Sequence, residues 1–180
     1  MELTLQDKPD DSTWRQALAL YRDAFAAEGR KPDAILERMF KKRISVLATG
    51  MEDGVMKAMA ICGVLAGPKL LLIDYLAVRE TDRRRGAGTE FVSLIADWAM
   101  TQRLDGLLIE AEAEDTPEND ARIRFWERCG FERTEYVHQY IWVPEPYRAM
   151  IRYFEPDRFA APDGRELFRY ISEFHGRSFR

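Results

Sequence analysis

In several short stretches of the chain apolar and polar residues alternate, and in others apolar residues follow one another without a break. Both patterns predict β-strands. We expect strands at residues 1–6, 43–50, 55–67, 69–78, 107–114, 131–137 and 138–143. The Glu-Asp-Gly sequence at residues 52–54 is typical of a hairpin turn between the second and third of these strands. The strand at 69–78 begins with an unbroken apolar run, which indicates burial on both faces.

Helical spacing of apolar residues predicts helices between these strands. The first helix is marked by Trp14, Leu18, Tyr21 and Phe25. Asp11 or Ser12 is its expected cap. Further helices are expected at residues 31–40, around 91–98, at 117–129 and at 162–176.

The order of elements, β-α-α-β-β-β-α-β-α-β-β and a tail helix, predicts an α+β fold with a central mixed, mostly antiparallel sheet flanked by helices. The hydrophobic pattern changes near residue 155. We therefore expect a main domain at residues 1–154 and a C-terminal helical appendage at 155–180, which packs on the domain or on a partner.

The composition narrows the classes of partner. The chain has 46% hydrophobic and 32% charged residues and a formal net charge of −4, without the basic excess typical of nucleic-acid binders. The longest apolar stretch, around residues 58–67, is shorter than the roughly 20 residues that a membrane helix needs. With two separated cysteines and no apolar signal core, we expect a cytoplasmic protein that binds neither nucleic acid nor membrane.

The segment at residues 83–89 joins a strand to a helix through arginines and two glycines. A glycine-rich turn at a helix start points backbone N–H groups in one direction, where the helix dipole also favours an anion. Arginines beside such a turn add charge-assisted hydrogen bonds. The segment is either a pyrophosphate site or a surface turn with solvated arginines.

Two motifs stand out when they are taken together. The first is Arg83-x-x-Gly86-x-Gly88, after a strand that ends in Leu-Ala-Val. The second, at residues 118–135, has an asparagine, a helix with an aromatic pair, and Gly-Phe opening a strand. They resemble the acyl-CoA signature and the second hallmark of the GCN5-related N-acetyltransferases, the GNAT family. The resemblance covers about residues 1–143 and includes the two helices after the first strand.

This resemblance implies acetyl-CoA or another acyl-CoA as co-substrate. Its pantetheine arm would bind the backbone of Leu76, Ala77 and Val78, and Asn119 would contact the same arm. The residues around its pyrophosphate would be Arg83, Arg84, Arg85, Gly86, Ala87, Gly88 and Thr89. The strands that carry Leu76 and Glu110 would separate, so that the thioester lies between them.

Acyl transfer to an amine needs a group that removes a proton from the ammonium. Glu110, Glu112 and Glu114 alternate on one expected strand and therefore share a face. They form either a solvated sheet face or an acceptor cleft, in which burial and mutual repulsion would raise one carboxyl pKa. Glu110 is the first candidate base and Glu112 the second, while Asp74 is a weaker one.

The proton donor for the leaving thiolate is left open. The family often places a tyrosine just before the Glu/Lys-x-x-Gly of the second hallmark, but here Trp126 stands at that position, and an indole is not a useful acid. We take Tyr136 as the candidate, with Tyr140, Cys129 or water as alternatives. His138 is a base or a core residue, and His175 in the tail is expected to be structural. With two histidines and two separated cysteines, no metal site is expected.

These observations predict an N-acyltransferase that transfers an acetyl group from acetyl-CoA to a primary amine of a small molecule or peptide, by direct attack in a ternary complex. The alternative is a non-catalytic acyl-CoA-binding or regulatory module, which the tryptophan at residue 126 supports. A third reading is an acetyltransferase that acts on tRNA or on a ribosomal protein, and the acidic charge disfavours tRNA. Whether the chain forms a homodimer is left open.

Overall fold

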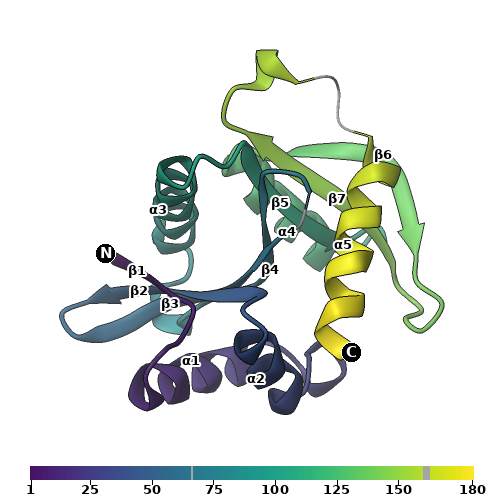
Figure 1. Ribbon diagram of the computed structural model, residues 1–180. Helices are drawn as coiled ribbons and strands as arrows, with labels where there is room; N and C mark the ends of the chain where they lie inside the picture. The colour runs from purple at the N-terminus through teal and green to yellow at the C-terminus, as the bar shows by residue number, and fades with distance from the viewer. Residues whose placement is uncertain (66, 160–162) are drawn as a thin grey trace.

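The computed structural model describes residues 1–65, 67–159 and 163–180, which form a seven-stranded sheet with helices on both faces (Figure 1). In chain order the elements are β1 (Glu2–Gln6), α1 (Asp11–Ala24), η1 (Ala27–Gly29), α2 (Asp33–Lys41), β2 (Ser45–Glu52), β3 (Val55–Val64), β4 (Leu70–Val78), η2 (Glu80–Asp82), α3 (Ala87–Thr101), β5 (Gly106–Glu112), α4 (Pro117–Arg128), β6 (Glu132–Gln139), β7 (Pro146–Tyr153), η3 (Pro156–Arg158) and α5 (Gly164–Phe179). The expected α+β fold with a mixed, mostly antiparallel sheet is confirmed. The parts of the expected strand and tail helix at Ala66 and Pro162 fall outside the described residues. None of the described helices has the length and hydrophobicity to cross a bilayer.

The strand order is β1-β2-β3-β4-β5-β7-β6, and β4 and β5 form the parallel pair within this sheet. That pairing covers only the starts of the two strands, from Leu70 opposite Gly106 to Leu72 opposite Leu108. The other neighbouring strands are antiparallel. The sheet is therefore split in its middle, beyond Leu72 and Leu108.

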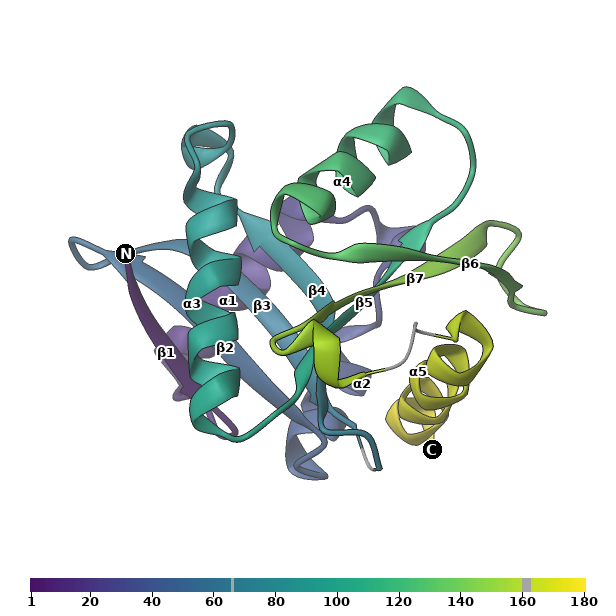
Figure 2. The same cartoon turned by 90° about the horizontal axis from the view of Figure 1, so that it is seen from above.

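Two hydrophobic clusters hold the layers together. One face of the sheet packs against α1, α2 and α5 through buried side chains such as Tyr21, Leu36 and Phe174. The other face packs against α3 through Phe91 and Ile95, and α4 adds partly buried side chains there. Figures 1 and 2 show α3 on the side of the sheet opposite to α1.

The tail helix α5 is packed into the first of these clusters. Leu167, Phe168, Ile171 and Phe174 are buried, and α5 lies against α2, β6 and β7 (Figure 2). The Phe174 ring fills the space where a Cβ would stand on Gly63 of β3. Residues of the expected appendage thus share a core with residues of the main domain, and the proposed division at residue 155 stays a prediction.

The last two strands differ from the expectation. A separate strand at residues 138–143 is wrong, because β6 continues to Gln139 and the next strand is β7. Since β7 pairs with both β5 and β6, its centre is buried, and Ala149, Met150 and Ile151 form an apolar run without alternation. Pro146 stands at the first residue of β7, a position where sheets tolerate proline.

The start of α1 is also shifted from the expectation. The cap is Asp10, not Asp11 or Ser12, and its Oδ1 accepts hydrogen bonds from the backbone N–H groups of Ser12 at 2.9 Å and Thr13 at 3.0 Å. An aspartate before the first turn satisfies N–H groups that have no partner inside the helix. The helix therefore begins one residue earlier in the acidic run.

Candidate functional site

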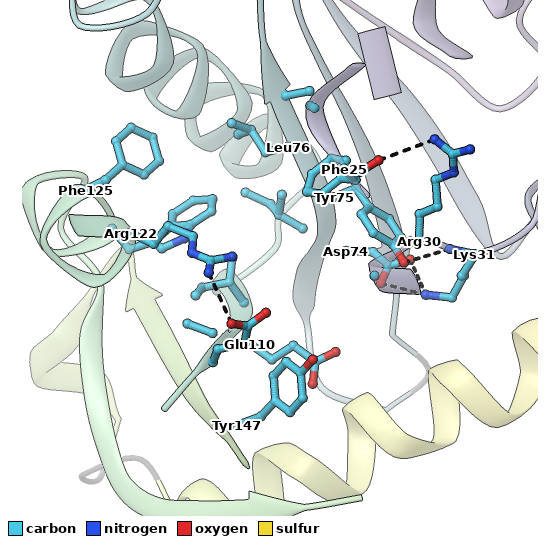
Figure 3. A pocket seen from close by; sticks show the side chains of 18 of the residues that line it. Phe25, Arg30, Lys31, Asp74, Tyr75, Leu76, Glu110, Arg122, Phe125 and Tyr147 are labelled. Carbon is cyan, nitrogen blue, oxygen red and sulfur yellow. Dashed lines mark hydrogen bonds and ion pairs between the residues drawn. The ribbon is translucent and has the colours of Figure 1, made fainter. Parts of the chain in front are cut away.

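The split between β4 and β5 opens into a cavity of about 1290 Å³ (Figure 3). Its walls come from the end of α1 and the residues after it, from β4, β5, α4 and α5, and from the loop between β6 and β7. A β-bulge lies in this wall: Ile73 and Tyr75 of β4 face the adjacent residues Cys62 and Ile61 of β3, so Asp74 is the extra residue. Bulges bend a strand and redirect a side chain, and this one begins directly after the last β4–β5 pair.

One end of the cavity, which we call the glycine-turn end, is lined by Arg83, Arg84, Gly86, Gly88 and Thr89. Gly86 has φ +84° and directly precedes α3, and among the described residues no side chain caps the first N–H groups of that helix. A Cβ on Gly86 would meet no atom within 4 Å, so the backbone angle, not space, requires glycine there. An uncapped helix N-terminus with adjacent arginines fits a phosphate group.

The structure brings most of the expected cofactor residues to this cavity. Besides the glycine-turn end, Leu76, Ala77 and Val78 of β4 line it, on the part of β4 that has no pairing with β5. Arg83 Nε donates a hydrogen bond to the Val78 carbonyl at 2.9 Å. Arg85 and Ala87 do not line the cavity.

Asn119 also lies outside the cavity lining, and its side chain has structural contacts. It is 3% exposed, donates from Nδ2 to the Glu114 carbonyl at 3.1 Å, and accepts at Oδ1 from Arg122. These bonds hold the connection between β5 and α4. An effect of Asn119 on a ligand would therefore act through the position of Arg122, which does line the cavity.

The other end, which we call the carboxylate end, is formed by Lys31, Asp74, Glu110, Tyr140 and His175. Glu110 Oε1 lies 2.6 Å from His175 Nε2, and Tyr140 Oη donates to Glu110 Oε2 at 2.7 Å. Lys31 Nζ binds the two Asp74 oxygens at 2.8 Å and 2.7 Å. In Figure 3, Asp74 and Lys31 lie on the β4 side, and Glu110 and Tyr147 lie on the opposite side.

The pKa of Glu110 moves in the direction opposite to the expectation. Burial raises it, but the hydrogen bond and charge of His175, the Tyr140 hydroxyl and the charge of Lys31 more than offset burial, so the pKa lies below its ordinary value. The expected repulsion between carboxylates is also relieved. Glu112 pairs with Arg122 at 3.1 Å, and Glu114 lies beyond the end of β5 and is exposed.

Tyr136, the expected proton donor, is not in the cavity lining. Its hydroxyl lies 3.2 Å from His138 Nδ1, its ring packs near Phe168 of α5, and the Arg165 guanidinium lies over the ring. His138, also outside the cavity lining, stacks on Phe168. Trp126 does line the cavity and packs against Phe125 and Phe131.

Sequence reasoning missed Lys31, Tyr147 and the role of His175 in the cavity. Lys31 carries no signal, because its partner Asp74 is distant in the sequence and they meet only in the folded chain. His175 does carry one: it follows Ile171 by four residues and so shares the buried face of α5, where an ionisable side chain needs a partner.

Asp74, Glu110 and His175 have donor atoms of metal-ligating types, and these atoms all lie within 4.8 Å of one another. In the described residues, Lys31 binds both oxygens of Asp74, and Tyr140 and Nε2 of His175 engage the two oxygens of Glu110. A metal ion would have to displace Lys31 from Asp74.

Comparisons with known proteins agree with this geometry. A model of the acetyltransferase (GNAT) family matches residues 14–131. No curated protein matches the chain. Similar solved folds include the ribosomal-protein-S18-alanine N-acetyltransferase of Escherichia coli (TM-score 0.61, 16% identity, covering 90% of this chain and 97% of that one). An aminoglycoside 6'-N-acetyltransferase complexed with coenzyme A has TM-score 0.67, 13% identity and coverage of 91% and 100%. An acetyltransferase of Bacillus subtilis in complex with CoA has TM-score 0.59, 12% identity and coverage of 84% and 97%.

The family match covers more than half of the chain and contains both the glycine turn and the strand that carries Glu110. The structural likenesses lie below 25% identity and support the fold. The chain belongs to the acetyltransferase (GNAT) family.

Proposed function

We propose that this protein is an N-acetyltransferase that transfers an acetyl group from acetyl-CoA to a primary amine in a ternary complex. The observation that carries the proposal is the continuous cavity that runs from the uncapped N-terminus of α3, along the unpaired part of β4, to the carboxylate end. Family membership supports acyl transfer from acetyl-CoA in general.

The residues fit an acyl-CoA at two places. At the glycine-turn end, the α3 N–H groups and Arg84 would hold the pyrophosphate. Along residues 76–78, β4 offers backbone groups that have no partner in β5, so an extended pantetheine arm can add to this edge as a strand would. A β4 N–H near the thioester would stabilise the oxyanion that forms during transfer.

The acceptor amine would enter at the carboxylate end. Phe25, Tyr75, Tyr147 and Trp142 give this region apolar walls, and Glu110 and Glu112 provide negative charge. A cationic amine on a small molecule or a peptide suits this combination. Two of the fold neighbours are described as acting on such amines, an aminoglycoside and an alanine of a ribosomal protein.

The test measures acetyl-CoA binding by the shift it causes in the thermal unfolding temperature. It compares the wild type with a matched pair of α3 variants. Thr89→Glu places a carboxylate in the first turn of α3, where it favours the helix but repels pyrophosphate. Ser93→Glu adds the same charge one turn further along, on an exposed position outside the cavity lining. At about 100 times its dissociation constant the ligand should add roughly 2.7 kcal/mol, which is about 5–10 °C for this size.

We expect this shift in the wild type and in Ser93→Glu, and its loss in Thr89→Glu. No shift in the wild type at millimolar acetyl-CoA would refute the proposal. Release of free CoA is then measured with spermidine, kanamycin and an N-terminal alanine peptide as acceptors. Binding without turnover of any of these amines would favour the non-catalytic acyl-CoA-binding module, for which Trp126 in place of a tyrosine is the argument.

A further inference from the structure

The tail helix α5 supplies a side chain to the carboxylate end. His175 lines the cavity with a side chain that is 15% exposed, and its Nε2 lies 2.6 Å from Oε1 of Glu110, which is itself 17% exposed. Glu110 comes from β5 and Tyr140 from the residue after β6, so elements from distant parts of the chain meet at one carboxylate. The contact between His175 and Glu110 is buried enough to fix the two side chains, and it is exposed enough for a substrate in the cavity to reach them.

The two imidazole nitrogens of His175 have different surroundings. Nε2 is held by Glu110, whereas Nδ1 has no hydrogen-bond partner within residues 1–65, 67–159 and 163–180. A carboxylate at one nitrogen fixes the tautomer and the orientation of the ring, and leaves the other nitrogen as an acceptor. We propose that His175 is the catalytic base that takes the proton from the acceptor ammonium, and that Glu110 is the residue that positions it.

This inference rests on the proposed acetyl transfer, and it names Nδ1 of His175 as the atom that accepts the proton of the ammonium group. Glu110 itself is not assigned as the base, because both of its oxygens are engaged and its pKa is lowered. Tyr140 has a raised pKa owing to burial and the charge of Glu110, and it therefore stays a donor to that carboxylate. The other charged groups at this end, Asp74 of β4 and Lys31, are paired with each other.

Nδ1 of His175 takes one proton from the R–NH₃⁺ group, and the free amine nitrogen forms a bond to the thioester carbonyl carbon. The C–S bond then breaks, and the sulfur leaves with the electron pair of that bond and takes the second nitrogen proton, directly or through water. The products are the N-acetyl amine, CoA thiol and a proton on His175, which passes to solvent.

The chain contains two histidines, which gives a matched control. His175→Gln removes the base and keeps a hydrogen-bonding side chain, while His138→Gln removes the histidine that lies outside the cavity lining. For each protein we would measure the dissociation constant for acetyl-CoA. We would also measure kcat and KM across pH 5–9, with whichever of spermidine, kanamycin and the alanine peptide the wild type acetylates fastest. General-base catalysis contributes about 10²–10⁴-fold.

We expect kcat of His175→Gln to fall at least about 10²-fold with an unchanged acetyl-CoA dissociation constant, and the acidic limb of its pH profile to be lost. His138→Gln should keep wild-type kcat and profile. Imidazole added to His175→Ala should restore part of kcat, which a purely structural role of the ring would not allow. Glu110→Gln should lower kcat less than His175→Gln.

Wild-type kcat and an unchanged pH profile in His175→Gln would overturn the inference and leave the acetyltransferase proposal standing. A lost pH limb in Glu110→Gln, together with its retention in His175→Gln, would instead make Glu110 the base. If the wild type binds no acetyl-CoA or acetylates none of the amines, the proposed function falls and this inference falls with it. A variant that loses acetyl-CoA binding as well as kcat would show a structural role and would also overturn the assignment.

Discussion

The two ends of the cavity are built in different ways. The glycine-turn end comes from one segment, residues 83–89, whose conformation follows from a left-handed glycine and a helix start. The carboxylate end brings together Lys31, Asp74, Glu110, Tyr140 and His175, each from a different part of the chain. The first is a local structure, and the second exists only when the sheet and α5 are complete.

The two ends also differ in their energetics. Arg83, Arg84 and Gly86 are exposed, so solvent screens their charges and substitutions there should affect binding more than stability. At the carboxylate end, Lys31 and Asp74 have side chains that are 6% and 3% exposed. Buried ionic groups lose their hydration, so each depends on its partner, and substitutions there should cost stability as well as activity.

The largest effect is expected from Lys31→Met, which keeps an apolar stem but leaves Asp74 without its cation. An unpaired buried carboxylate should lower the free energy of unfolding by about 3–5 kcal/mol. The measurement is urea unfolding at pH 7. The double variant Lys31→Met/Asp74→Leu removes both charges and should recover most of the loss. If the single and double variants are equally unstable, packing by Lys31 rather than the ion pair holds this end together.

A smaller effect, which depends on pH, is expected from Glu110→Gln. Because the pKa of Glu110 is lowered on folding, the native state binds fewer protons than the unfolded state, and the carboxylate stabilises the fold above the unfolded pKa of about 4.5. The charged hydrogen bonds lost in the variant are worth about 1.5–3 kcal/mol. Urea unfolding at stepped pH should show this difference at pH 5.5, and the difference should shrink as the pH falls toward 3.

The same measurement on Glu112→Gln is the control. Glu112 also lies on β5, but its partner Arg122 is exposed, so solvent screens their ion pair. Its substitution should change the free energy of unfolding by less than about 0.5 kcal/mol. If the difference in free energy of unfolding between the wild type and Glu110→Gln instead grows as the pH falls, the Glu110 carboxyl is protonated in the native state. Its contacts would then raise its pKa on folding instead of lowering it.

The contrast between the two ends explains what the sequence could predict. The glycine turn, the uncapped start of α3 and the separation of β4 from β5 follow from local patterns and from the family resemblance. Glu110 does line the cavity, but its pKa was expected to rise, because the groups that lower it are distant in the sequence: His175 of α5, Tyr140 after β6, and Lys31. Tyr136 was preferred to Tyr140 although only the latter reaches Glu110.

The strand β7 was missed for a related reason. An apolar run between prolines and charged residues resembles a surface excursion, and only its position between β5 and β6 makes burial on both faces favourable. In the same way, the docking of α5 depends on space left by Gly63 for the Phe174 ring, which no local pattern of the tail reveals. Non-local pairing and packing therefore limit what the pattern can predict, and they also determine where His175 lies.

The smallest effect on stability is expected from Arg84→Asn at the glycine-turn end. Arg84 has φ +61°, a region that asparagine adopts more readily than arginine, so the free energy of unfolding should change by less than about 0.5 kcal/mol. Removing its charge should weaken acetyl-CoA binding by about two- to fivefold at low salt, and this loss should decrease as salt is added. Arg103→Asn is the matched control, because Arg103 also has positive φ, at +58°, but lies beyond the other end of α3 and outside the cavity lining. Calorimetric titration with acetyl-CoA should separate the two variants while their unfolding curves stay alike. Equal affinities would show that Arg84 is a solvated residue of the turn, and the phosphate contact would then rest on the α3 N–H groups and Arg83.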